Sequence, residues 1–151
     1  FPKIIACGGS WMVKEDLIEA GDFDKIRDMT REAVQTMLGF ELAHIGINAE
    51  NAEEAESIAK LFEAAFGFGA KVGNSSVFAG TAVEVMKTPY LGKNGHIAIA
   101  TNYLSRAIAY LKSKGYEFDE DTCKYDAKGN MTAIYFKQDF GGFAVHLVQK
   151  K

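Results

Sequence analysis

Two short stretches of the chain alternate bulky apolar residues with histidine or small residues, as in a β-strand that has two unlike faces. Residues 95–101 read Gly-His-Ile-Ala-Ile-Ala-Thr and follow a Gly-rich turn at 92–95. Because successive side chains point to opposite faces of a strand, His96 shares a face with two alanines, and Ile97 and Ile99 occupy the other face. We expect the isoleucines to face a hydrophobic layer. His96 then points away from it, where the alanines leave room.

The same pattern occurs once earlier in the chain. Residues 42–48 read Leu-Ala-His-Ile-Gly-Ile-Asn, so His44 and Gly46 share one face. Each stretch precedes a run with apolar residues at helical spacing, over about 51–66 in the first case and 103–114 in the second. This self-similarity indicates an internal repeat.

The remaining apolar runs complete the repeat. Three short strands are predicted after each helix, near 70–72, 75–78 and 82–86 in the first half and near 116–122, 131–137 and 143–148 in the second. The plan is therefore βαβββ twice, an α+β fold class. Residues 1–38 differ: an apolar run at 4–7 predicts a buried strand, and two helices follow, the second beginning after Asp22. We therefore expect two domains, 1–38 and 39–151.

Composition narrows the class of protein. Of the 151 residues, 48% are hydrophobic and 25% charged, which is typical of a globular chain. The net charge of −3 and the lack of a basic run argue against a nucleic-acid partner, and the lack of a long apolar stretch argues against a membrane partner. Two isolated cysteines, Cys7 and Cys123, indicate a reducing, cytoplasmic compartment. Because the chain begins at Phe1, we expect it to be a piece of a longer protein.

The three histidines of the chain lie at matching places in the repeat. The last strands of the halves also agree, Ala-Val-Glu-Val at 82–85 with Ala-Val-His-Leu at 144–147. The first and last strands of the modules thus carry one polar side chain each, opposite the bulky aliphatics: His44, Glu84, His96 and His146. Three imidazoles and a carboxylate that converge form a divalent-metal site, and this donor set favours zinc, with nickel or iron as other options. The alternative, a domain with no metal, stays open.

Residues 1–38 contain motifs of a known family. These are Ala-Cys-Gly-Gly-Ser-Trp-Met-Val at 6–13, Leu-Ile-Glu-Ala-Gly-Asp-Phe-Asp at 17–24 and Thr-Arg-Glu-Ala-Val at 30–34. They resemble the eighth strand and last helix of the 2-dehydro-3-deoxy-6-phosphogluconate (KDPG) and 4-hydroxy-2-oxoglutarate (KHG) aldolases, TIM barrels that form a Schiff base through a lysine. The resemblance implies that Gly8, Gly9 and Ser10 help to hold the substrate phosphate in the parent barrel. The Schiff-base lysine lies outside this segment, so we expect no aldolase activity from it alone.

Residues 42–149 resemble the vicinal oxygen chelate superfamily, which includes glyoxalase I and the extradiol dioxygenases. The motifs are Leu-Ala-His at 42–44, Ala-Val-Glu-Val at 82–85, Gly-His-Ile-Ala at 95–98 and Phe-Ala-Val-His-Leu at 143–147. The resemblance implies that two βαβββ modules build a curved mixed sheet around a divalent metal. The ligands of metal-dependent glyoxalase I are commonly His, Glu, His and Glu; this chain has His146 where the last Glu is expected.

These resemblances imply two functions. In the first, the chain is the C-terminal part of a bifunctional KHG/KDPG aldolase, and its glyoxalase-like metal domain acts on an α-oxo or α-hydroxy carbonyl compound, a small carbonyl or sugar-acid substrate, with Glu84 or His146 as base. In the alternative, the domain is a metal-stabilised, non-catalytic binding or assembly module of the aldolase. The reason is that His146 stands where the resemblance leads us to expect the catalytic glutamate. We expect a homo-oligomer, and the sequence leaves open whether the ligands come from one chain or two.

Overall fold

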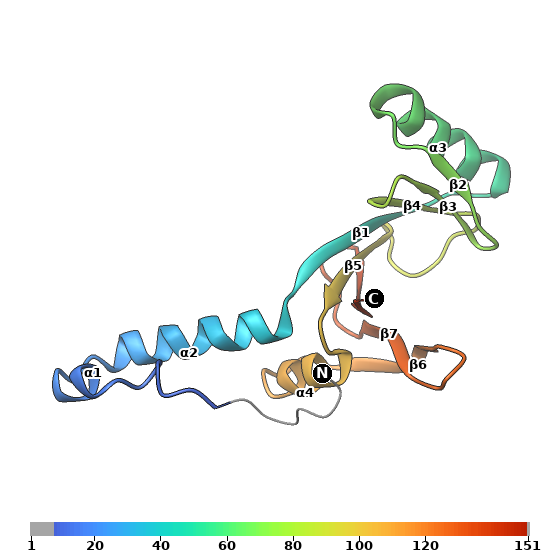
Figure 1. The fold of residues 1–151 in the computed structure, drawn as a ribbon. Helices are drawn as coiled ribbons and strands as arrows, with labels where there is room; N and C mark the ends of the chain where they lie inside the picture. Colours follow the sequence, from blue (N-terminus) through green and yellow to red (C-terminus); the bar gives the residue numbers. More distant parts are fainter. Residues whose placement is uncertain (1–7, 151) are drawn as a thin grey trace. The chain divides into compact units, whose positions relative to one another are not determined.

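The computed structural model describes residues 8–150, and the chain divides into two compact units, Phe1–Leu38 and Gly39–Lys151. The strand predicted at 4–7 lies outside the described residues. The first unit contains α1 (Glu15–Glu19) and α2 (Phe23–Leu38), as the helical spacing predicted (Figure 1). The carboxylate of Asp22 accepts a hydrogen bond from the Lys25 amide at 3.2 Å and so caps α2, and Phe23 on this helix is 64% exposed.

The second unit contains one eight-stranded sheet and two helices (Figure 1). Its elements in chain order are β1 (Glu41–Asn48), α3 (Ala52–Phe66), β2 (Ala70–Val72), β3 (Ser76–Ala79), β4 (Val83–Met86), β5 (His96–Thr101), α4 (Leu104–Lys112), β6 (Phe118–Tyr125), β7 (Met131–Phe136) and β8 (Ala144–Gln149). This is the predicted βαβββ plan, present twice. Among residues 8–150, no helix has the length and apolar character needed to cross a membrane.

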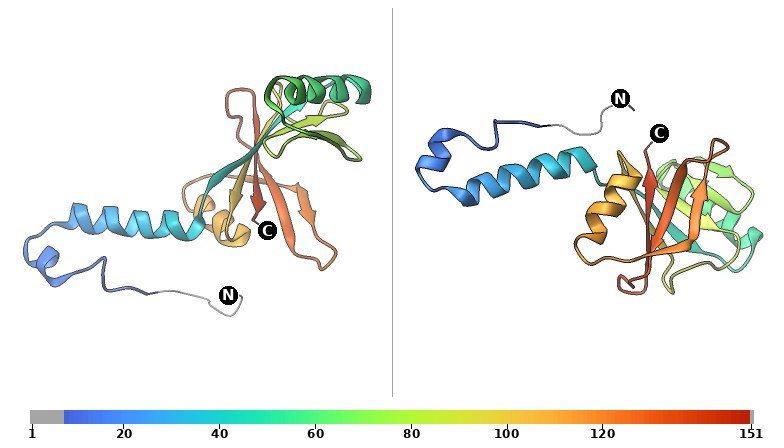
Figure 2. Two further views of the ribbon diagram at one scale, coloured as in Figure 1. Left: turned by 45° about the horizontal axis from the view of Figure 1, so that its top comes forward. Right: turned by 90° about the horizontal axis from the view of Figure 1, so that it is seen from below.

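The strand order β2-β3-β4-β1-β5-β8-β7-β6 places the two modules side by side. β1 and β5 pair antiparallel at the centre, and each pairs in parallel with the last strand of its own module, β4 or β8. The strands of the two modules meet along these central strands, with α3 against the strands of the first module and α4 against those of the second (Figure 2). The predicted α+β class with a curved mixed sheet is therefore confirmed.

Each helix buries small residues against its own module. Ala55 and Ala59 of α3 lie in one cluster with Val77 of β3 and Val85 of β4, all fully buried. In the second module, Ala107 of α4 is buried in the same way, and α4 contacts β7 and β8. Alanine has a small side chain, which lets each helix lie close to the strands of its module.

The burial of the two faces of the central strands differs from the expectation that the isoleucine face would be the covered one. Ile47 packs against the core of the first module, as predicted, but Ile45 is 41% exposed, so the isoleucine face of β1 is only partly covered. The face that carries His96 is the more buried one: His96 is 2% exposed, and Ala98 is fully buried. The reason is topological, because each helix covers the outer strands of its own module and the central strands lie between them.

The start of α3 offers a local test of the fold. The Asn51 side chain accepts a hydrogen bond from the Glu54 amide at 2.9 Å and supplies the N-cap. Asn51→Ala is expected to lower the free energy of unfolding by about 1 kcal/mol, because one helix-terminal amide loses its partner. Urea denaturation measures the loss. Asn74→Ala, which changes an exposed asparagine in a turn, is the control and should have little effect.

Candidate metal centre

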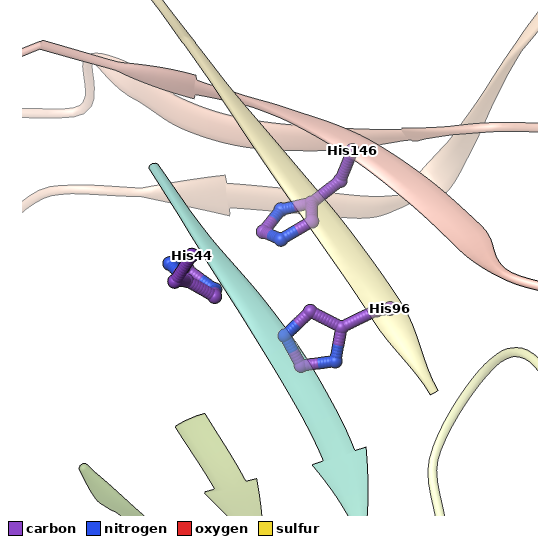
Figure 3. A group of neighbouring side chains, drawn as sticks. All are labelled: His44, His96 and His146. Carbon is purple, nitrogen blue, oxygen red and sulfur yellow. The ribbon is translucent and has the colours of Figure 1, made fainter. Parts of the chain in front are cut away.

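Four adjacent strands bring the four predicted metal ligands together. His44 lies on β1, His96 on β5 and His146 on β8, and their rings converge on one space (Figure 3). One ring nitrogen of each lies within 4.8 Å of the corresponding atom of the other two. Glu84 of β4 joins this group: its Oε2 lies 3.1 Å from Nε2 of His44 and 3.2 Å from Nε2 of His96.

The strand register explains why these side chains meet. Gly46 of β1 lies opposite Glu84 on one side and His96 on the other. Its module-two equivalent, Ala98 of β5, lies opposite His44 and His146. The antiparallel pairing of β1 and β5 thus relates the two modules by an approximate twofold symmetry. A small residue at the centre of each half leaves the space that the imidazoles occupy.

Gly46 tests this packing directly. A Cβ atom added at Gly46 would overlap the ring of His96. Gly46→Ala is therefore expected to lower the free energy of unfolding by about 1–3 kcal/mol through overpacking. The double variant with His96→Ala removes the obstructing ring, so the two losses should be far from additive in urea denaturation. Additive losses would show that Gly46 does not serve to accommodate His96.

Four buried nitrogen atoms of the three imidazoles lack hydrogen-bond partners. Both ring nitrogens of His146 and Nδ1 of His96 have none, and Nε2 of His44 approaches Glu84 without the alignment of a hydrogen bond. A buried polar atom without a partner costs about 1–3 kcal/mol. Several such atoms around one space are unusual in a folded protein unless a ligand satisfies them.

The electrostatics favour an ionised carboxylate at Glu84 and a neutral imidazole at His146. Burial alone raises the pKa of Glu84, but contacts with His44, His96 and the Ser76 hydroxyl outweigh it and hold that pKa well below its usual range. Burial, together with the neighbouring His96 and His44, lowers the pKa of His146 to about 3. At neutral pH, Glu84 is therefore ionised and His146 neutral, the forms in which both side chains bind metal ions.

Two further side chains border the cluster. The ring of Tyr135 on β7 stacks on His146, with the centroids 4.4 Å apart and the planes 11° from parallel. Burial, with smaller effects from Tyr90 and Glu84, raises the pKa of Tyr135, so its hydroxyl stays protonated. Ser76 on β3 donates a hydrogen bond to Glu84 Oε1 at 2.6 Å. Sequence analysis missed both contacts, because they depend on how β3 and β7 pair with β4 and β8.

The four side chains have the chemistry that a divalent ion needs. Donors bound to one zinc ion at about 2.0–2.2 Å lie roughly 3–3.5 Å from one another. The separations of Glu84 Oε2 from His44 Nε2 and His96 Nε2 fall in this range. The residues therefore fit a divalent metal ion, and the cluster lies within a single chain.

The turn that carries Gly8, Gly9 and Ser10 belongs to the first unit. Ser10 is exposed, and its carbonyl accepts a hydrogen bond from the Val13 amide at 3.0 Å. Gly8 and Gly9 line a groove of about 770 Å³ together with Trp11 and residues of α2.

Comparisons with known proteins give short sequence matches to one family and structural likenesses to another. No family model matches the chain. A KHG/KDPG aldolase from Escherichia coli K12 is 50% identical over 33 residues, and a 2-dehydro-3-deoxy-phosphogluconate aldolase from Treponema pallidum is 44% identical over 34 residues. Each match covers 22% of this chain, and the chain spans only 16% of the length of these relatives.

Solved structures share the architecture at low identity. A hypothetical protein from Bacillus halodurans C-125 superposes with a TM-score of 0.52 and 15% identity, over 74% of this chain and 95% of that one. A methylmalonyl-CoA epimerase in complex with methylmalonyl-CoA and NH4+ gives 0.51 and 18%, over 72% and 93%. The epimerase from Mycobacterium tuberculosis gives 0.50 and 14%, over 76% and 90%. These likenesses show the fold alone: the chain contains the curved mixed sheet of the glyoxalase-like, vicinal oxygen chelate fold.

Proposed function

We propose that the second unit, Gly39–Lys151, is a metal-dependent domain that acts on an α-oxo or α-hydroxy carbonyl compound. His44, Glu84, His96 and His146 would hold one divalent ion, with zinc favoured by the donor set. One observation carries the proposal. Several buried imidazole nitrogens lack hydrogen-bond partners and lie close to one another and to the ionised carboxylate of Glu84.

The residues of the chain would divide the chemistry between them. A bound ion supplies Lewis acidity that polarises a carbonyl group and acidifies the neighbouring C–H bond. Glu84 carries the one carboxylate in the set and is the group that would accept a proton from that carbon. His146, whose ring is neutral at neutral pH, is the other candidate base. Tyr135 keeps His146 in place by stacking on it.

Metal content tests the proposal. Protein purified without chelators should contain about one zinc ion per chain by elemental analysis. The loaded protein should then convert at least one member of a panel of 2-oxo acids, aldoses and hemithioacetals. A chain without metal would contradict the whole proposal, whereas a loaded chain that leaves the panel unchanged would contradict the catalytic part. Light scattering on the same sample tests the expected homo-oligomer.

A second candidate function is a metal-stabilised, non-catalytic binding or assembly module. The observation that favours it is the number of donors, since three imidazoles and one carboxylate suffice to close a tetrahedral zinc site. Cobalt substitution separates the two functions. An absorption spectrum that shifts when a 2-oxo acid is added indicates an open position and supports catalysis; a spectrum that stays unchanged supports the closed module.

We further propose that residues 1–38 are the last strand and helix of a KHG/KDPG aldolase barrel. The short matches to such aldolases and the exposed Phe23 on α2 support this, because a barrel would cover apolar side chains that this unit alone leaves in water. A chimera tests it: residues 1–38 replace the corresponding end of the Escherichia coli aldolase. Cleavage of KDPG and KHG should be retained. Gly9→Val in the chimera should impair cleavage of phosphorylated KDPG more than that of KHG, which has no phosphate.

A further inference from the structure

The carboxylate of Glu84 has different partners for its two oxygens. Oε1 accepts the 2.6 Å hydrogen bond from the Ser76 hydroxyl, and Oε2 faces His44 and His96. Ser76 is itself buried, with 6% of its surface exposed. We propose that Ser76 is a positioning residue, which holds Glu84 so that a single oxygen, Oε2, is offered to the metal. The proposal rests on the proposed metal function of the second unit.

The second module provides an internal comparison. In the first module, Phe78 lies opposite Glu84, and Ser76 lies two residues before Phe78 on β3. In the second module, Tyr135 lies opposite His146, and the residue two before it on β7 is Ala133. Alanine has no hydroxyl, and His146 has no hydrogen-bond partner for either ring nitrogen. The serine thus occurs only in the module whose last strand carries the carboxylate.

The physical need for such a residue follows from the side chain of glutamate. The terminal torsion of Glu has a broad energy profile, so a carboxylate without a fixed partner can rotate and present either oxygen or both. A hydrogen bond to one oxygen removes that freedom before the metal binds. Partners of this kind typically account for about 10–100-fold in metal affinity. We expect an effect of that size from Ser76.

The experiment compares variants at position 76 in the full chain. Ser76→Ala removes the hydroxyl, and zinc affinity from competition with a chromophoric chelator should fall about 10–100-fold. Ser76→Thr and Ser76→Val form a matched pair of nearly equal shape, of which only Thr keeps the hydroxyl. The Thr variant should bind zinc nearly as the wild type does, and the Val variant should be as weak as the Ala variant. Ser75→Ala, which changes the exposed neighbouring serine, is the control and should bind as the wild type does.

The cobalt spectrum adds a reading that simple loss of stability would not give. A carboxylate that presents both oxygens changes the coordination number, so the spectrum of Ser76→Val should differ from that of Ser76→Thr at full occupancy. Equal affinities and equal spectra for the Thr and Val variants would overturn the role of Ser76 while leaving the metal site intact. A wild-type chain that binds no zinc would overturn the proposed function, and the role of Ser76 with it.

Discussion

His96→Ala is expected to lower zinc affinity about 100-fold or more. His96 is the most buried of the four candidate ligands, and its Nε2 lies 3.2 Å from Glu84 Oε2. Structural zinc sites bind with roughly 10–16 kcal/mol in total, so an average share for one of four ligands is about 3 kcal/mol. Because each 1.4 kcal/mol corresponds to a tenfold change in affinity, the loss of one ligand weakens binding by at least two powers of ten.

The same variant should lose the stabilisation that metal gives to the fold. Zinc at 100 times its dissociation constant stabilises a native state by about 2.7 kcal/mol, and a 100-fold weaker site loses most of this at the same concentration. The measurement is the difference in melting temperature with and without zinc for each protein. This difference cancels the cost of the cavity that the missing ring leaves. The wild type should gain several degrees and His96→Ala almost none.

Ser10→Ala is the control for both readings, because Ser10 lies in the first unit and the proposed ligands lie in the second. Its metal content and its zinc-dependent rise in melting temperature should equal those of the wild type. A His96→Ala protein that kept full zinc content would show that the cluster is not the metal site.

The repeat made much of the second unit predictable. The His-Ile-Gly-Ile and His-Ile-Ala-Ile runs at 44–47 and 96–99 indicated equivalent strands, and the structure pairs these two strands at the centre of the sheet. Period-two alternation then placed each histidine on the face away from the isoleucines. The helix expected over about 51–66 is α3, which has Asn51 as its N-cap and ends at Gly67, in the left-handed conformation in which helices often end.

The contacts of Ser76 and Tyr135 were beyond prediction for a physical reason. They depend on the register of β3 with β4 and of β7 with β8, and short strands joined by loops do not encode their register in a local pattern. The pairing of β1 with β5 also contains an irregularity between Leu42 and His44 that strict alternation does not foresee. Such a bulge turns the strand just before a candidate ligand.

Mild acid is expected to destabilise the metal-free protein, and His146 should be responsible. Its pKa is about 3 in the folded chain and 6.5 in its unperturbed form, because burial and the neighbouring His96 and His44 disfavour the imidazolium. Below pH 6.5 the unfolded chain therefore binds a proton that the folded chain does not. Stability is complete above pH 6.5 and falls as the pH drops towards 3, by about 1.4 kcal/mol per pH unit.

Between pH 7.5 and pH 5, this single group should lower the free energy of unfolding by about 2 kcal/mol. Urea denaturation of chelator-treated protein at several pH values measures the decrease. The range stops at pH 5 because Glu84, whose pKa also lies below its usual value, adds a loss in the same direction only below about pH 4.5. His146→Gln removes the titrating group and should flatten the curve over this range. An equally steep curve for wild type and variant would show that His146 is not kept neutral by the fold, and hence that its ring is not held ready for a cation.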